Sequence, residues 1–203
     1  MSETKSGSET KSGSETKSGS ETKSGPIDEI IEYMQIEKRE IKKNGLLYDH
    51  FFKVDNTDEE RALYSACENG HLDIVNVLLQ ANKIQINQAH DNGWTPLNVA
   101  CQKGHVNVVR VLLEREDIEI NRADNYRATP LFMACQQGHL DIVNVLLKRE
   151  DIEINQAMKD GVTPLYIACH EGHVNVVRAL LQSNEIQINK PMKDGATPLF
   201  VVC

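Results

Sequence analysis

Cysteine and histidine are the side chains of this chain with the most reactive chemistry, because a thiolate is a strong nucleophile and an imidazole can take up its proton. Cys169, His170 and His173 form the densest group of this kind. A Cys-His hydrolase also needs an orienting group, and all three groups must converge in one cleft. Close neighbours along a helix do not converge on one point. We therefore predict that these 203 residues are not an enzyme and hold no catalytic residue.

Metal and cofactor sites are likewise not expected. Tetrahedral zinc sites use cysteine pairs two to four residues apart, and no such pair occurs. The glycine-rich loop that holds nucleotide phosphates is also missing. The five cysteines instead recur at intervals of 34 residues, at Cys67, Cys101, Cys135, Cys169 and Cys203. Equivalent positions in stacked helices lie about 8–10 Å apart, too far for a disulfide, so we interpret these cysteines as small apolar core residues.

The charge of the chain argues against nucleic acid as a partner. Its formal net charge is −8, and the acids and bases leave no basic stripe that could attract phosphates. No apolar run reaches the roughly 18 residues that a membrane span requires. The N-terminus lacks the apolar stretch of a secretory signal, and free thiols persist in reducing compartments. The expected setting is the cytoplasm, with the nucleus as the alternative.

Two internal repeats organise the chain. The first is Ser-Glu-Thr-Lys-Ser-Gly, copied four times within residues 1–25 without any aliphatic or aromatic residue after Met1. Such a segment cannot form a core, so we expect a disordered tail. Its role is open between a spacer and a phosphorylated regulatory tail, and the sequence does not decide between them.

The second repeat has a period of 34 residues. Thr-Pro-Leu begins at residues 95, 129, 163 and 197, and Gly-His begins at residues 70, 104, 138 and 172. In each unit the threonine suits an N-cap, the proline suits the first helical position, and Gly104 suits the left-handed residue that ends the helix. A second helix follows, with apolar residues such as Val109 and Leu112 on one face. Helices of about ten residues are marginal alone, so the units must stack.

These residues resemble the ankyrin repeat family. The shared pattern is Thr-Pro-Leu-x-x-Ala-Cys-x-x-Gly-His-x-x-Val-Val-x-x-Leu-Leu, and it covers residues 55–203 as about four repeats plus a truncated fifth. The resemblance implies an all-α ankyrin-repeat solenoid, in which helix-turn-helix repeats alternate with β-hairpin-like finger loops. It also implies a concave face of fingers and first helices that holds a protein partner.

The chain departs from the family pattern at several positions. The histidine that usually follows Thr-Pro-Leu is replaced by Asn98, Phe132, Tyr166 and Phe200. Glycine occupies the finger turn except in the third unit, where Arg127 must either accept a positive φ or change the turn. The first unit has Arg61 in place of the threonine.

Both ends of the array need a cover for their apolar surface. Residues 26–54 carry isoleucines at helical spacing, and we interpret them as a capping helix and connector, with a partner-binding helix as the alternative. The sequence stops at Cys203 within the first helix of the fifth unit. We expect either a truncated gene product or another protein chain covering that end.

Positions that vary between repeats on the concave side are the candidates for partner binding. Trp94, Tyr126 and Arg127 are the residue types that most often anchor protein interfaces. The full set of predicted protein-binding residues is Asn92, Trp94, Asn98, Gln102, Lys103, Asn125, Tyr126, Arg127, Phe132, Gln136, Gln137, Lys159, Val162, Tyr166, His170 and Glu171. We predict a non-enzymatic scaffold for an unidentified protein; the alternative is a regulatory ankyrin segment of a longer enzyme or signalling protein.

Overall fold

The computed structural model describes residues 58–80 and 84–198. The repeated tail, the proposed capping segment 26–54 and the last residues of the fifth unit lie outside them. The described part contains eight helices and no strand. They are α2 (Asp58–Asn69), α3 (Leu72–Leu79), α4 (Pro96–Lys103), α5 (Val106–Leu113), α6 (Pro130–Gln137), α7 (Leu140–Leu146), α8 (Pro164–His170) and α9 (Val174–Leu180).

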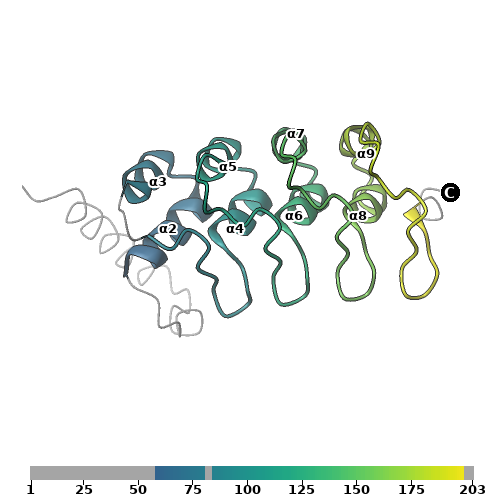
Figure 1. Cartoon of the computed structure of the whole chain (residues 1–203), viewed down its shortest axis with the longest axis horizontal. Coiled ribbons are helices and arrows are strands. Elements are labelled where there is room, and N and C mark those ends of the chain that lie inside the picture. The colour runs from purple at the N-terminus through teal and green to yellow at the C-terminus, as the bar shows by residue number, and fades with distance from the viewer. Residues whose placement is uncertain (1–57, 81–83, 199–203) are drawn as a thin grey trace, which may run out of the picture.

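The helices form an elongated stack of hairpins. Figure 1 shows α2, α4, α6 and α8 in an inner row, α3, α5, α7 and α9 in an outer row, and finger loops that project on the side away from the outer row. We name the four fingers by the repeats they precede: the second (residues 84–94), third (118–128), fourth (152–162) and fifth (186–196). The inner helices pack on one another more extensively than the outer helices do. This is the predicted solenoid.

The inner helices begin and end where the sequence places their caps. Thr95 is extended, and its hydroxyl oxygen accepts a hydrogen bond from the backbone N–H of Asn98, while Pro96 occupies the first turn. Gly104 ends α4 in the left-handed region. Thr129 and Thr163 cap α6 and α8 in the same way. The helices span seven to eight residues after the first repeat, slightly fewer than the expected ten; their stability must come from stacking.

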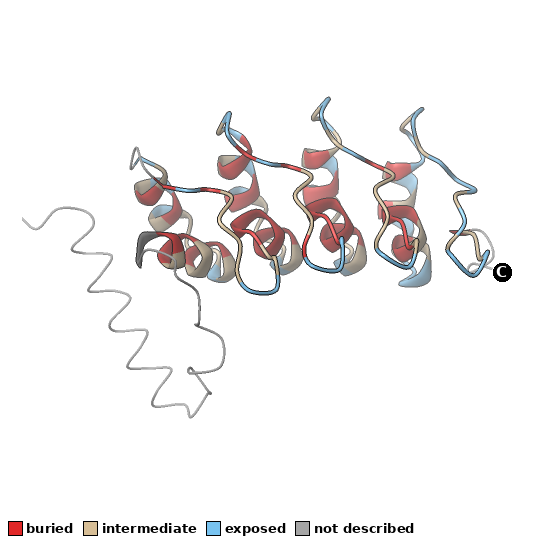
Figure 2. Ribbon diagram, turned by 60° about the horizontal axis from the view of Figure 1, so that its bottom comes forward, coloured by how far each residue is buried: buried red, intermediate tan, exposed pale blue. Residues whose placement is uncertain are grey.

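The core is a set of columns that run through the stack. Leu63, Leu97, Leu131 and Leu165 occupy one repeat position and are at most 2% exposed. Figure 2 shows that burial concentrates on the facing sides of the helices, whereas the finger loops are only partly buried and are exposed at their tips. Each fully buried leucine contributes about 1.5–3 kcal/mol of transfer free energy, and stacking of neighbouring repeats completes its burial.

Hydrogen bonds reinforce this apolar packing between repeats. His105, His139 and His173 each use Nε2 to donate to a backbone carbonyl of the preceding inner helix, over 2.9–3.0 Å. Because a carbonyl can only accept, this contact fixes the Nε2–H form of each ring. Asn121 also bridges two fingers: its Nδ2 donates to the Asp151 carbonyl and its Oδ1 accepts from the Glu153 N–H. Polar residues that recur at the same position in successive repeats therefore join each repeat to the next.

The cysteine column is structural. Cys67, Cys101 and Cys135 are free thiols that are completely buried, and Cys169 is partly exposed. Burial in apolar surroundings raises the pKa of all four thiols, because it disfavours the charged thiolate. The prediction of apolar core residues is confirmed for the three buried cysteines. Cys203 lies outside the described residues.

Candidate functional site

The finger loops place the predicted anchor residues at tight turns. In the second finger the N–H of Gly93 donates to the His90 carbonyl, and Gly93 has a φ of +84°. The side chain of Asn92 accepts from the Trp94 N–H at 3.0 Å and so stabilises the turn. Asp160 makes the equivalent contact in the fourth finger. A β-hairpin-like turn thus forms without a ladder of paired strands.

The third finger forms the same turn with different residues. Arg127 adopts a φ of +69°, and it is the one non-glycine residue with positive φ in the described part of the chain. The sequence allowed either a positive φ at Arg127 or a different turn. The structure has the same turn, with Arg127 in the strained conformation. Tyr126 occupies the position of Asn92 and cannot accept a bond from the turn. Asp124 supplies the acceptor in this finger. The Oδ1 atom of Asp124 accepts hydrogen bonds from the N–H groups of Tyr126 and Ala128, both at 2.8 Å.

Neighbouring fingers are joined at their tips by backbone hydrogen bonds. The Asn125 N–H donates to the Asn92 carbonyl over 3.1 Å. The Lys159 N–H donates to the Tyr126 carbonyl over 3.2 Å, and the Lys193 N–H donates to the Asp160 carbonyl over 3.0 Å. Because each contact involves the main chain, it persists whatever side chain the tip displays. The fingers therefore form one connected ridge with variable side chains.

Trp94 has a structural contact as well as a candidate binding role. Its indole Nε1 donates to Oδ2 of Asp124 in the next finger at 3.1 Å, and the ring is half-buried. Trp94 thus ties the second finger to the third. A substitution of Trp94 would change both the ridge and any contact with a partner.

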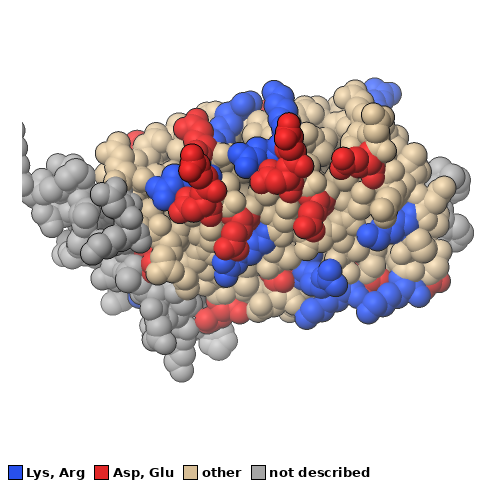
Figure 3. Space-filling view, viewed as in Figure 1, with Lys and Arg blue, Asp and Glu red and all other residues tan. Residues whose placement is uncertain are grey.

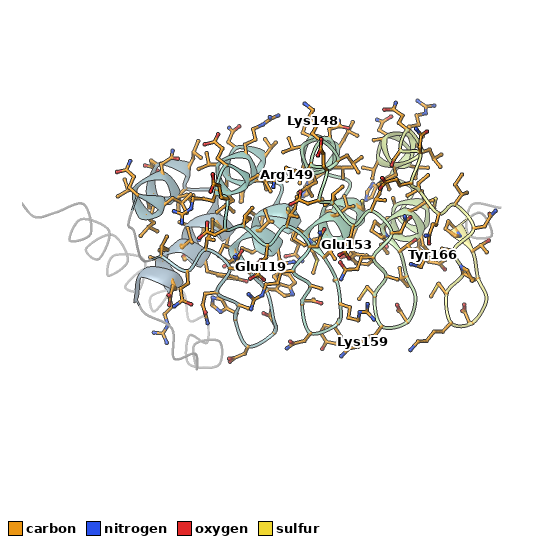
Figure 4. The ribbon with its side chains drawn as sticks, in the orientation of Figure 1. Glu119, Lys148, Arg149, Glu153, Lys159 and Tyr166 are labelled. Carbon is orange, nitrogen blue, oxygen red and sulfur yellow. The ribbon has the colours of Figure 1, made fainter. Side chains whose placement is uncertain are left out.

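The inner helices supply a second row of side chains beside the fingers. Tyr166 is half-buried on α8, and its ring stacks on that of His170 with centroids 6.4 Å apart. The imidazole Nδ1 of His170 lies 3.0 Å from a carboxylate oxygen of Glu171. Figure 4 shows Tyr166 at α8 and Lys159 at the tip of the fourth finger. An aromatic and polar patch is present at this end of the row.

Three predicted binding residues are corrected by the structure, because their side chains are buried. Asn98 is 0%, Phe132 is 3% and Val162 is 8% exposed. Phe132 and Val162 belong to the apolar core. The Asn98 side chain is hydrogen-bonded to Thr95 in its own repeat and to the Arg122 carbonyl in the third finger. We remove them from the candidate surface. Four further predicted residues are half-buried: Trp94, Gln102, Gln136 and Tyr166.

The remaining predicted residues are available to a partner. The exposed ones are Asn92, Lys103, Asn125, Tyr126, Arg127, Gln137, Lys159, His170 and Glu171. They lie in two parallel rows, one on the finger tips and one on the inner helices. Tyr126 is the most exposed large apolar side chain among the described residues, at 64%. Whether these rows bind a protein stays a prediction.

Two residues of this region were not anticipated from the sequence. Asp124 supports the third finger turn and holds Trp94. The Glu68 carboxylate lies 3.7 Å from the ammonium group of Lys103, which is one of the predicted binding residues. It therefore partly neutralises the charge of Lys103. The sequence does carry a signal for Asp124. The third finger has neither a glycine nor an Asn or Asp at its turn, and it alone has an acidic residue at the position of Asp124.

An open hollow of about 600 Å³ adjoins the fourth finger. Glu153, Glu185, Arg127 and Lys190 are among its lining residues, so its charges are mixed. No group of three histidine, cysteine or acidic side chains within the described residues could hold a metal ion. Within the same ranges, no helix is long and apolar enough to cross a membrane.

Replacing Arg127 with glycine should raise the free energy of unfolding by about 0.5–1 kcal/mol. Glycine removes the left-handed strain of about 1–2 kcal/mol, and the greater entropy of its unfolded state offsets part of this gain. Urea unfolding followed by circular dichroism measures the change. Tyr126→Gly is the matched control in the same turn: it relieves no strain and should destabilise the chain. A less stable Arg127→Gly protein would mean that the arginine side chain contributes more than the strain costs.

Comparison with known proteins agrees with the geometry. The model of a single ankyrin repeat matches residues 58–91, and the model of three ankyrin repeats matches residues 81–158 and 131–203. A search of curated proteins gave no significant match. The matched ranges together cover the stacked hairpins and well over half of the chain. Ankyrin repeats generally act as modules for protein–protein interaction, and this chain belongs to the ankyrin repeat family.

Proposed function

We propose that the chain is a non-enzymatic scaffold that binds a protein partner along its finger tips and inner helices. The observation that carries the proposal is the ridge of fingers, whose backbones are hydrogen-bonded tip to tip while their exposed side chains differ from repeat to repeat. A fixed frame with variable side chains is suited to recognition, because few groups must be ordered on binding.

Binding in place of catalysis is part of the proposal. The buried thiols support it, because a raised pKa and a lack of access make Cys67, Cys101 and Cys135 poor nucleophiles. The exposed imidazole of His170 is held by the neighbouring Glu171 and lies beside a tyrosine ring, which is a combination that also suits an interface. The compartment in which binding occurs is proposed to be the cytoplasm or the nucleus.

The test uses immobilised full-length chain, and mass spectrometry to identify the proteins that it captures. Tyr126→Ala and Tyr166→Ala remove one anchor from each row, and each should reduce capture of the same protein at least ten-fold, since buried aromatic anchors dominate interface energies. Glu116→Ala, at an exposed loop position outside both rows, is the control and should capture normally. Circular dichroism should show unchanged helicity in all three variants. Undiminished capture by both tyrosine variants would contradict the proposed surface.

A further inference from the structure

The outer helices carry six exposed charged residues that the protein-binding proposal does not use. They are Asp73 on α3, Arg110 and Glu114 on or at the end of α5, Asp141 on α7, Lys148 just after α7, and Arg178 on α9. None of the six forms an ion pair or a side-chain hydrogen bond with another described residue. By contrast, Arg115 and Arg149 each hold an aspartate with two hydrogen bonds. We call the exposed side of α3, α5, α7 and α9 the outer face.

The signs of these charges alternate along the stack. Asp73 and Asp141 lie in the first turns of the first and third outer helices, whereas Arg110 and Arg178 lie in the last turns of the second and fourth. This order follows from the sequence, since the helices repeat in pairs at intervals of 68 residues. At the C-terminal ends of the two central helices, Glu114 on the second is followed by Lys148 on the third.

A pattern of this kind is complementary to itself under one two-fold rotation. An axis that runs parallel to the helices, between α5 and α7, places the first outer helix of one copy against the fourth of the other, and the second against the third. Asp73 then faces Arg178, and Arg110 faces Asp141, with offsets of about one helical turn (~5 Å) that an arginine side chain can span. Glu114 faces Lys148 at the same level. Each of these three pairs joins opposite charges.

The competing two-fold arrangement is unfavourable. An axis along the stack would set each helix antiparallel to its own copy, and an axis passing at the level of Arg110 and Arg178 would bring each of these arginines against itself. Like charges in direct opposition suppress such a pairing. Charge complementarity therefore selects one orientation, with the two stacks running in opposite directions.

The outer face also offers apolar contact between its charges. Val111 on α5 and Val145 on α7 are partly exposed in the last turns of their helices and would oppose each other across the same axis. The four outer helices lie in one row in Figure 1, and Figure 3 shows lysine and arginine side chains projecting along that edge. Lys148 is labelled beside α7 in Figure 4. We propose that a second copy of this chain docks on the outer face and forms an antiparallel, charge-paired dimer.

The dimer is independent of the partner-binding rows, which lie on the fingers and inner helices. It would double the number of partner sites in one particle. Since its charge pairs are exposed, it should be sensitive to ionic strength. Sedimentation equilibrium of the full chain is expected to show a dimer in 20 mM salt, and a dissociation constant at least ten-fold higher in 300 mM salt.

A charge exchange between two variants tests the pairing itself. Glu114→Lys and Lys148→Glu each place like charges opposite one another twice, so each variant alone should be monomeric. Their equimolar mixture should form a dimer again, because every Lys of one chain then faces a Glu of the other. The double variant Glu114→Lys/Lys148→Glu should also dimerise. Attraction between residues 114 and 148 of a single chain cannot explain recovery in the mixture.

Glu116→Lys is the matched control, because it makes the same charge change at an exposed position beyond the end of α5. It should leave dimerisation intact, and circular dichroism should show that all variants remain folded. A chain that stays monomeric in low salt at all concentrations would overturn the proposal. So would a dimer that persists in both single variants, or a mixture that stays monomeric.

Discussion

Replacing Gly104 with alanine should lower the free energy of unfolding by about 3 kcal/mol. Gly104 has a φ of +85°, which costs any other residue about 1–2 kcal/mol. An added Cβ would lie 2.7 Å from Cε1 of His139, so the imidazole would have to move. That movement would break the 3.0 Å hydrogen bond from His139 to the Gln102 carbonyl, which is worth about 1 kcal/mol. Urea unfolding measures the loss.

Gly172 provides the matched control in the fourth repeat. It follows the C-cap residue of α8 and has a φ of +73°, yet an added Cβ would meet no atom of the described residues within 4 Å. Gly172→Ala should therefore lower the free energy of unfolding only by the backbone cost of a positive φ, about 1 kcal/mol. The difference between the two variants isolates the fit between a glycine and the histidine of the following repeat. Equal losses would mean that this fit contributes nothing to stacking.

Replacing Asn98 with alanine should lower the free energy of unfolding by about 2–3 kcal/mol. The Asn98 Oδ1 accepts from the backbone N–H and the hydroxyl of Thr95, at 2.9 Å and 2.6 Å. Its Nδ2 donates to the Arg122 carbonyl in the next finger at 3.3 Å. The side chain is completely buried, so alanine leaves these groups without a partner in a site that water does not reach. Chemical unfolding followed by circular dichroism and Trp94 fluorescence measures the change.

Gln102→Ala, one turn further along α4, is the control for Asn98→Ala. The Gln102 side chain is half-buried and makes no hydrogen bond with another described residue, so its loss should change stability by no more than about 0.5 kcal/mol. Asn98→Ala should leave partner capture unchanged at temperatures where the protein is folded. Normal stability combined with lost capture would return Asn98 to the binding surface.

The architecture could be predicted from the sequence because its signals are local. A Thr-Pro pair at a helix start and a glycine at its end act within one turn of chain, and their recurrence every 34 residues sets the repeat. The turn at Arg127 was predictable to within two outcomes for the same reason. In the structure Arg127 adopts the positive φ, and the Asp124 carboxylate stabilises the turn around it.

Availability to a partner could not be predicted, because it depends on contacts between repeats. Asn98 and Tyr166 occupy the same repeat position, yet the first is fully buried and the second is half-exposed. The Asn98 side chain donates a hydrogen bond to a carbonyl of the next finger, 24 residues away. The Trp94 indole donates one to an aspartate 30 residues away. A periodic pattern describes one unit at a time. The surface that each unit keeps is set by how its neighbour packs against it.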